Sequence, residues 1–119
     1  MENTANRDLA RARHLLRPER ARVELRESAP QLPPGELGAL AALGFEASSG
    51  VAVSVYAFER QDQHAAATDR LKSATPAGSG RVLSGSNGRL LFFGYARADA
   101  GPEAASILGR LASAFAGDE

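Results

Sequence analysis

Residues 84–96, SGSNGRLLFFGYA, join an Asn-Gly pair to an unbroken run of large apolar side chains. Asn and Gly tolerate the positive φ angles of a tight two-residue turn, so Asn87-Gly88 predicts a β-hairpin between residues 81–84 and 89–97. A strand with one wet face alternates apolar and polar residues, and this run does not alternate. Both faces of the second strand should therefore be covered, because each large apolar side chain left in water forfeits about 1.5–3 kcal/mol.

A two-residue loop at Asn87-Gly88 also sets the register of the hairpin, which then pairs Ser86 with Arg89. One face of the hairpin carries Val82, Leu91, Phe93 and Tyr95, and the other carries Leu83, Leu90 and Phe92. We expect the two helices that follow residue 61 to cover one face together. The cover of the other face is left open between the N-terminal helix, a second copy of the chain and a bound ligand.

The segments around the hairpin predict a β-α-β-β-α core over about residues 51–116. Residues 51–58 are β-branched and aromatic and predict a strand. A helix is predicted at 62–74, capped by Asp62, and another at 101–115, which opens with Gly-Pro-Glu and carries an apolar stripe.

The residues before this core are less regular. Residues 4–17 have helical spacing, and Pro18 should end that helix. Residues 19–27 alternate like an edge strand but consist of good helix formers, and we favour the strand slightly. A proline-rich loop follows, and then a short helix is expected over residues 35–43, with Gly44 as its left-handed cap residue.

Together these elements predict the α+β class: a small, mainly antiparallel sheet of three or four strands with N-terminal helical cover. A chain of 119 residues with 44% apolar residues suits a single domain over residues 1–119 with one hydrophobic core. Residues 1–34 would hold the helix, the ambiguous segment and the proline-rich loop, and residues 35–116 the compact core.

The overall composition excludes several classes of function. Fourteen basic and fourteen acidic residues give a formal net charge of +0, so no general field attracts nucleic acid or anionic lipid. Without cysteine the chain has neither disulfides nor thiolate metal sites. No apolar run is long enough for a membrane span, and residues 1–16 lack a secretory core. These features predict a cytoplasmic protein, or a periplasmic one if a signal segment has been removed.

Candidate catalytic groups are few. Of the two histidines, His14 lies on an arginine-rich helix face, where a solvated side chain is expected. His64 follows Asp62 at a helix start, and the two form the one acid–base pair worth testing. Acidic and histidine side chains are common at helix N-termini, so we predict no catalytic residue, no metal site and no cofactor.

The remaining candidates are surfaces for binding. The residues we expect to contact a ligand or partner are Tyr56, Phe58, Phe92, Tyr95 and Arg89. Arg7 and Arg11 share one face of the first helix and could meet a protein partner. The leading hypothesis is a non-enzymatic interaction or regulatory module that binds a protein or a second copy of itself. The alternative is a domain that binds a glycan or small ligand on a sheet face, and a small enzyme is the third possibility.

The core resembles a known family in its order of elements: strand VAVSVYAF, helix HAAATDRLKSA, strand RVLSG, strand RLLFFGYA, helix EAASILGRLASAF. This order is similar to the core of SPOR domains, and the resemblance implies binding of denuded peptidoglycan glycan on an open sheet face. Arg89 matches the arginine that the family carries early in its third strand, whereas Val55-Tyr56-Ala57 and Gly94-Tyr95-Ala96 depart from its motifs. Small dimeric α-β barrel proteins share much of this order and pair through their sheets, which supports self-association equally well.

Overall fold

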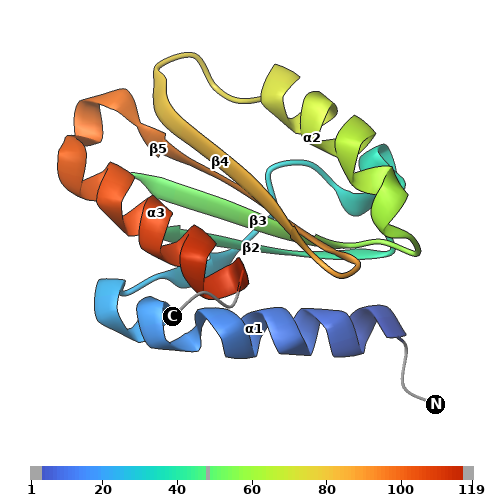
Figure 1. Cartoon of the computed structure of the whole chain (residues 1–119). Coiled ribbons are helices and arrows are strands. Elements are labelled where there is room, and N and C mark those ends of the chain that lie inside the picture. The colour runs from blue at the N-terminus through green and yellow to red at the C-terminus, as the bar shows by residue number, and fades with distance from the viewer. Residues whose placement is uncertain (1–3, 48, 117–119) are drawn as a thin grey trace.

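The computed structural model describes residues 4–47 and 49–116, and it confirms the α+β class (Figure 1). The elements in chain order are α1 (Thr4–Val23), β1 (Arg26–Ser28), the 3-10 helix η1 (Pro34–Leu37), β2 (Ala41–Ala47), β3 (Val51–Ala57), η2 (Gln61–Gln63), α2 (His64–Ser73), β4 (Ser79–Asn87), β5 (Leu90–Arg97), η3 (Ala98–Ala100) and α3 (Pro102–Ala116).

The strands form a single antiparallel sheet in the order β1-β2-β3-β5-β4. Strand β5 lies between β3 and β4, so α2 connects two strands that are not neighbours. The sheet has five strands, one more than the upper limit we predicted, because residues 26–28 and 41–47 also join it. Strands β1 and β4 are the two edges.

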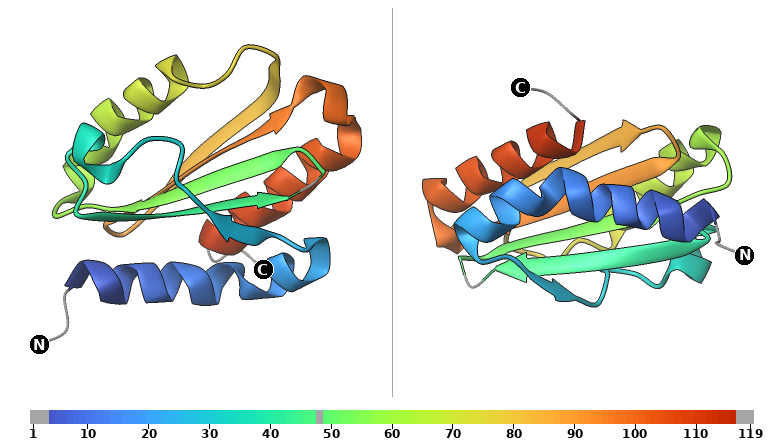
Figure 2. Two further views of the ribbon diagram at one scale, coloured as in Figure 1. Left: turned by 180° about the vertical axis from the view of Figure 1, so that it is seen from behind. Right: turned by 90° about the horizontal axis from the view of Figure 1, so that it is seen from below.

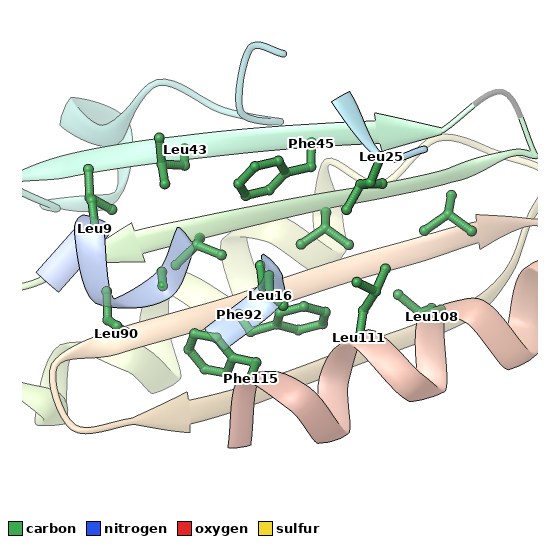
Figure 3. Packing of buried hydrophobic residues seen from close by; sticks show 14 of the residues in the cluster. Leu9, Leu16, Leu25, Leu43, Phe45, Leu90, Phe92, Leu108, Leu111 and Phe115 are labelled. Carbon is green, nitrogen blue, oxygen red and sulfur yellow. The ribbon is translucent and has the colours of Figure 1, made fainter. Parts of the chain in front are cut away.

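One face of the sheet is covered by α1 and α3, which pack against each other beneath it (Figures 1 and 2). From α1, the side chains of Leu9 and Leu16 reach the sheet, and Phe115 of α3 lies with its ring centroid 5.4 Å from that of Phe92 (Figure 3). The predicted N-terminal helical cover is thereby confirmed. Residues of β2, β3 and β5 that share this face, including Phe45 and Val55, are almost fully buried.

The opposite face is covered by α2 and by the segment between β1 and β2 (Figure 2). Here Leu71 of α2 packs with Tyr56, Leu91 and Phe93, and Leu32 adds partial cover. The expectation that α2 and α3 share one face was wrong. Helix α3 buries a wide apolar stripe, and α2 buries only two apolar residues, so α3 fits the larger face, which it shares with α1.

The hairpin forms as predicted in its faces but not in its register. The loop is Gly88-Arg89 instead of Asn87-Gly88, and the closing pair is Asn87 with Leu90. Of the two loop residues only Gly88 has a positive φ, 61°, which fits a turn with glycine at its first central position. Each β4 residue consequently lies opposite a β5 residue two places further along than predicted. An even shift keeps every side chain on its predicted face.

Helix α1 runs through Pro18 to Val23, so the predicted end at Pro18 was wrong. An interior proline removes a helix hydrogen bond and costs roughly 3 kcal/mol. Packing on both sides of the proline offsets that cost. Leu16 is fully buried before it, and the Arg20 guanidinium after it lies 4.6 Å from the ring centroid of Phe45.

The ambiguous segment 19–27 is divided between two elements, since its first part ends α1 and its last part enters β1. The turn between them is at Glu24, whose φ of 54° is left-handed. The backbone N–H of Leu25 donates to the Arg20 carbonyl at 3.1 Å, the six-to-one bond of a Schellman motif. A strand over the whole segment was therefore wrong.

The helix predicted over residues 35–43 is replaced by the short η1 and by strand β2. The β2 sequence, AALGFEA, holds no β-branched residue, so local propensity favoured a helix, and pairing with β3 overrides that preference. Gly44 is a strand residue here and not a helix cap. A Cβ at this position would lie 2.3 Å from the Ala29 carbonyl oxygen, so glycine is required by the close crossing of the chain.

Candidate functional site: the outer edge of strand β4

The most open feature of the sheet is its β4 edge. Within the part of the chain that the structure describes, β4 pairs only with β5, although it is nine residues long. Its side chains are mostly exposed, in contrast to the buried strands beside it. Val82 on this strand is 36% exposed, and it is one of two exposed large apolar side chains among the described residues, the other being Leu40.

The hairpin geometry determines which backbone groups point outward from this edge. A tight turn is closed by a hydrogen-bonded pair, here Asn87 with Leu90. Hydrogen-bonded and non-bonded pairs then alternate along the antiparallel ladder. The N–H and C=O groups of Val82, Ser84 and Ser86 are consequently directed away from β5. They are donors and acceptors without a strand partner in the described chain.

The side chains of the same three residues, Val82, Ser84 and Ser86, lie on the sheet face that carries α2. Helix α2 packs over β3 and β5 through Ala67 and Leu71, and its first residue, His64, reaches Ser86 near the turn, whereas Val82 and Ser84 are exposed. The edge therefore combines free backbone groups with an adjacent accessible surface.

Two shallow hollows lie beside this strip, and residues 76–79, where the chain enters β4, line both of them. One has a volume of about 430 Å³ and lies between Lys72, Val82 and the loop residues 75–79. The other has a volume of about 360 Å³ and is lined on its β5 side by Tyr95 and Arg97. A small polar group could enter either hollow.

The structure places most of the predicted binding aromatics in the core. Tyr56, Phe58 and Phe92 are at most 1% exposed and present no ring face to a ligand. The Tyr56 hydroxyl donates to the Leu32 carbonyl at 2.8 Å and accepts from the Leu32 N–H at 3.0 Å. Burial raises the pKa of Tyr56, although the bond from the Leu32 backbone acts in the opposite direction. Tyr95 alone is partly exposed, opposite Val82 in the register.

Two of the three predicted arginines, Arg11 and Arg89, lie at the tip of the hairpin. Arg89, in the loop, forms an ion pair of 3.4 Å with Asp8 of α1. Arg11 donates to the Asn87 side-chain carbonyl, and the amide nitrogen of Asn87 donates to the Phe115 carbonyl at 2.7 Å. Arg7 is exposed on the same helix. Arg11 and Arg89 thus join α1 to the hairpin, a structural role that spacing along the helix could not indicate.

His64 is buried at the start of α2 and uses both ring nitrogens. Its Nε2–H donates to the Arg89 carbonyl at 3.1 Å, so its Nδ1 accepts from the Ser86 hydroxyl at 2.6 Å. The Asp62 carboxylate accepts from Arg60 at 3.1 Å, and both ring nitrogens of His64 bond to other groups. The imidazole therefore connects α2 to the hairpin, and its serine partner could not be identified from sequence spacing.

Other kinds of site receive no support from the described residues. None of their His, Asp and Glu side chains gather in a group of three that could hold a metal ion. Nor does any helix in the described ranges combine the length and apolarity that crossing a bilayer requires.

No protein-family model, curated protein or solved structure matches this chain. The similarity to SPOR domains thus rests on element order and on the position of Arg89. The aromatic rings that it would assign to a glycan-binding face are largely core residues.

Proposed function

We propose that this protein is a non-catalytic interaction module that binds its partner along the outer edge of β4. The observation that carries this proposal is a nine-residue edge strand with no proline and a single charged residue, Arg81. Long edges of this kind invite pairing with another chain, and proteins usually protect them with charges, prolines or bulges. The only irregularity in β4 lies at its start, between Ser79 and Arg81.

Strand addition is the binding mode that suits this edge. An extended segment laid beside β4 would pair with the outward groups of Val82, Ser84 and Ser86, and main-chain hydrogen bonds would provide much of the affinity. Selectivity would come from side chains over the accessible strip, where Val82 offers an apolar contact and Ser84 offers a hydroxyl, since the Ser86 hydroxyl is bonded to His64. Because strand addition uses groups that are already aligned, the protein itself needs little ordering on binding.

The proposal is tested by selecting linear peptides from a random phage-displayed library on the wild-type protein. Each selected peptide is then measured against Ser84→Pro and Ser84→Ala. Proline removes an outward N–H without removing a bond to β5, so the fold should persist while peptide binding falls at least tenfold. Ser84→Ala keeps the backbone groups and should bind like the wild type.

Ser84→Lys replaces the proline variant if the latter loses its circular-dichroism spectrum, since a lysine opposes edge pairing without altering the backbone. A library that yields no binder dependent on residue 84 would overturn the proposal. So would binders that contact the two folded variants and the wild type equally well.

A second candidate function is the binding of a glycan or small polar ligand in the hollow beside Tyr95. It is favoured by the partly exposed ring of Tyr95 and by Arg97 in the same lining. An aromatic ring is suited to stacking on a sugar, and Arg97, which pairs with Asp99 at 3.2 Å in the same lining, can donate to sugar hydroxyls. In a glycan-array screen, binding that is lost in Tyr95→Ala and kept in Ser84→Pro would favour this function over strand addition.

A further inference from the structure

We propose that the β4 edge is occupied by a second copy of this chain, in an antiparallel β4–β4 pair with its two-fold axis at Leu83. This inference rests on the proposed function, because it assigns a partner to the same edge. Three properties of β4 favour a second copy: the symmetry of its register, the position of its one charge, and its apolar residues near the middle of the strand.

The register follows from the symmetry. Two identical antiparallel strands are related by a two-fold axis, and an axis at Leu83, the midpoint of Ser79–Asn87, gives the longest overlap. It places Val82 opposite Ser84 of the second copy. Both residues have outward backbone groups, so they meet as a hydrogen-bonded pair. The symmetry of the strand and the alternation of its bonds therefore agree.

The one charge on β4 is compatible with this register. Arg81 lies opposite Gly85 of the second copy, so the two guanidinium groups are not directly opposed. The space beside Gly85 is free, since a Cβ built there meets no atom within 4 Å. A long arginine side chain can therefore lie across the second copy without a clash. An axis at Arg81 would instead place like charges face to face, which is destabilising.

The apolar residues near the middle of β4 would be covered by the same pairing. On the α3 side, Leu83 meets Leu83 of the second copy, and it is only partly buried in the single chain. On the α2 side, Val82 loses part of its exposed surface. A shallow hollow of about 700 Å³ lies along the contact of β4 with α3, and besides Ser106 and Gly109 it is lined by Arg81 and by Arg110, which pairs with Glu19.

The absence of native cysteine allows a direct test by disulfide cross-linking. We would mix Arg81→Cys with Gly85→Cys under mild oxidation. In the proposed register these positions form a non-hydrogen-bonded pair, the close type of antiparallel pair, within reach of a disulfide. Identical positions are four residues apart along the pair, roughly 14 Å, and cannot be bridged. The mixture should therefore form a covalent dimer and each variant alone should not.

Both variants are compared with Glu27→Cys on the β1 edge, and their thermal unfolding is compared with that of the wild type. Cross-linking of either β4 variant alone, or equal cross-linking of Glu27→Cys, would overturn the proposed register. A wild-type chain that light scattering shows to be monomeric at millimolar concentration would overturn self-pairing itself. If the chain is monomeric but selected peptides bind the wild type and not the Ser84→Pro variant, β4 still binds a partner and only self-pairing is wrong. If no such peptides are found either, both proposals are wrong.

Discussion

The two edges of the sheet are built in opposite ways. Strand β1 has three residues, two of them charged, and Glu27 forms an ion pair of 3.1 Å with Arg13 of α1. A proline follows at position 30, and the chain then crosses back over Gly44. Strand β4 has nine residues, one charge and no proline. Its outer side faces no other described strand.

This difference indicates which edge is suited to binding. Short length, charge and proline are the features by which natural sheets prevent pairing with other chains. Strand β1 is short and charged, and a proline lies two residues after it. Strand β4 lacks these features over most of its length. Because one edge of the same sheet is protected and the other is not, we propose that the partner binds at β4 and not at β1.

The largest expected effect compares two glycines. Gly44→Ala, at the β1 side, places a methyl group against the Ala29 carbonyl and should lower the free energy of unfolding by about 3 kcal/mol. Gly85→Ala, on β4, enters open space and should change it by less than about 0.5 kcal/mol. Urea unfolding of both variants measures the difference. Equal losses would mean that the two edges are packed alike.

A lysine introduced at each edge in turn shows which edge mediates self-association. Ser84→Lys should weaken self-association at least tenfold, because lysine on an edge strand opposes pairing. Glu27→Lys removes the ion pair with Arg13, which is worth about 1 kcal/mol or less at an exposed site, and should leave association unchanged. Sedimentation velocity over a range of concentrations compares the two. A larger effect of Glu27→Lys would reverse the assignment of the edges.

The segment that follows β1 is held by the Tyr56 hydroxyl, and this contact gives a pH dependence. The pKa of Tyr56 is raised in the folded chain, so its contribution to stability is full below about pH 10, the unfolded value, and is lost as the pH rises through the higher folded value. Between the unfolded and the folded pKa of Tyr56, the free energy of unfolding should fall by up to about 1.4 kcal/mol per pH unit. Tyr56→Phe should flatten this fall, and Tyr95→Phe is the control that should keep it. Parallel curves for Tyr56→Phe and the wild type would contradict the assignment.

The smallest expected effect concerns the turn into β1. Glu24 has a left-handed φ of 54° at the position where Schellman motifs usually have glycine. Glu24→Gly should therefore raise the free energy of unfolding by about 0.5–1 kcal/mol, because glycine adopts this conformation without strain. Thermal unfolding measures the gain, with Glu24→Ala as the matched control. A stabilisation of the same size by alanine would show that backbone strain is not its cause.

The sequence predicted the elements whose signals are local. Strand 51–57, helices α2 and α3, and the faces of the hairpin follow from periodicity and from the turn at Gly88. Strand β2 could not be found in this way, because AALGFEA has helical propensity and becomes a strand only through its neighbours. The hairpin register also required the structure, since Asn87 pairs within the ladder and leaves Arg89 to complete the loop.

The β4 edge could not be predicted from local sequence patterns either. Whether β4 lies at an edge depends on β5 pairing with β3, a contact between residues far apart in the chain. The aromatic residues were chosen as binding candidates for their chemistry, yet Tyr56 and Phe92 are the side chains that fill the two cores. Hydrophobic patterning identified which residues share a face, and it could not say which of them remain accessible.

The most direct test of the account is amide hydrogen exchange measured residue by residue at rising protein concentration. Exchange of the outward N–H groups of Val82, Ser84 and Ser86 should slow as concentration rises, while the amides of β1 should be unaffected. This result would locate a partner at the β4 edge and identify it as a second copy of the chain. Exchange at β4 that does not change with concentration, or slowing confined to β1, would contradict the account.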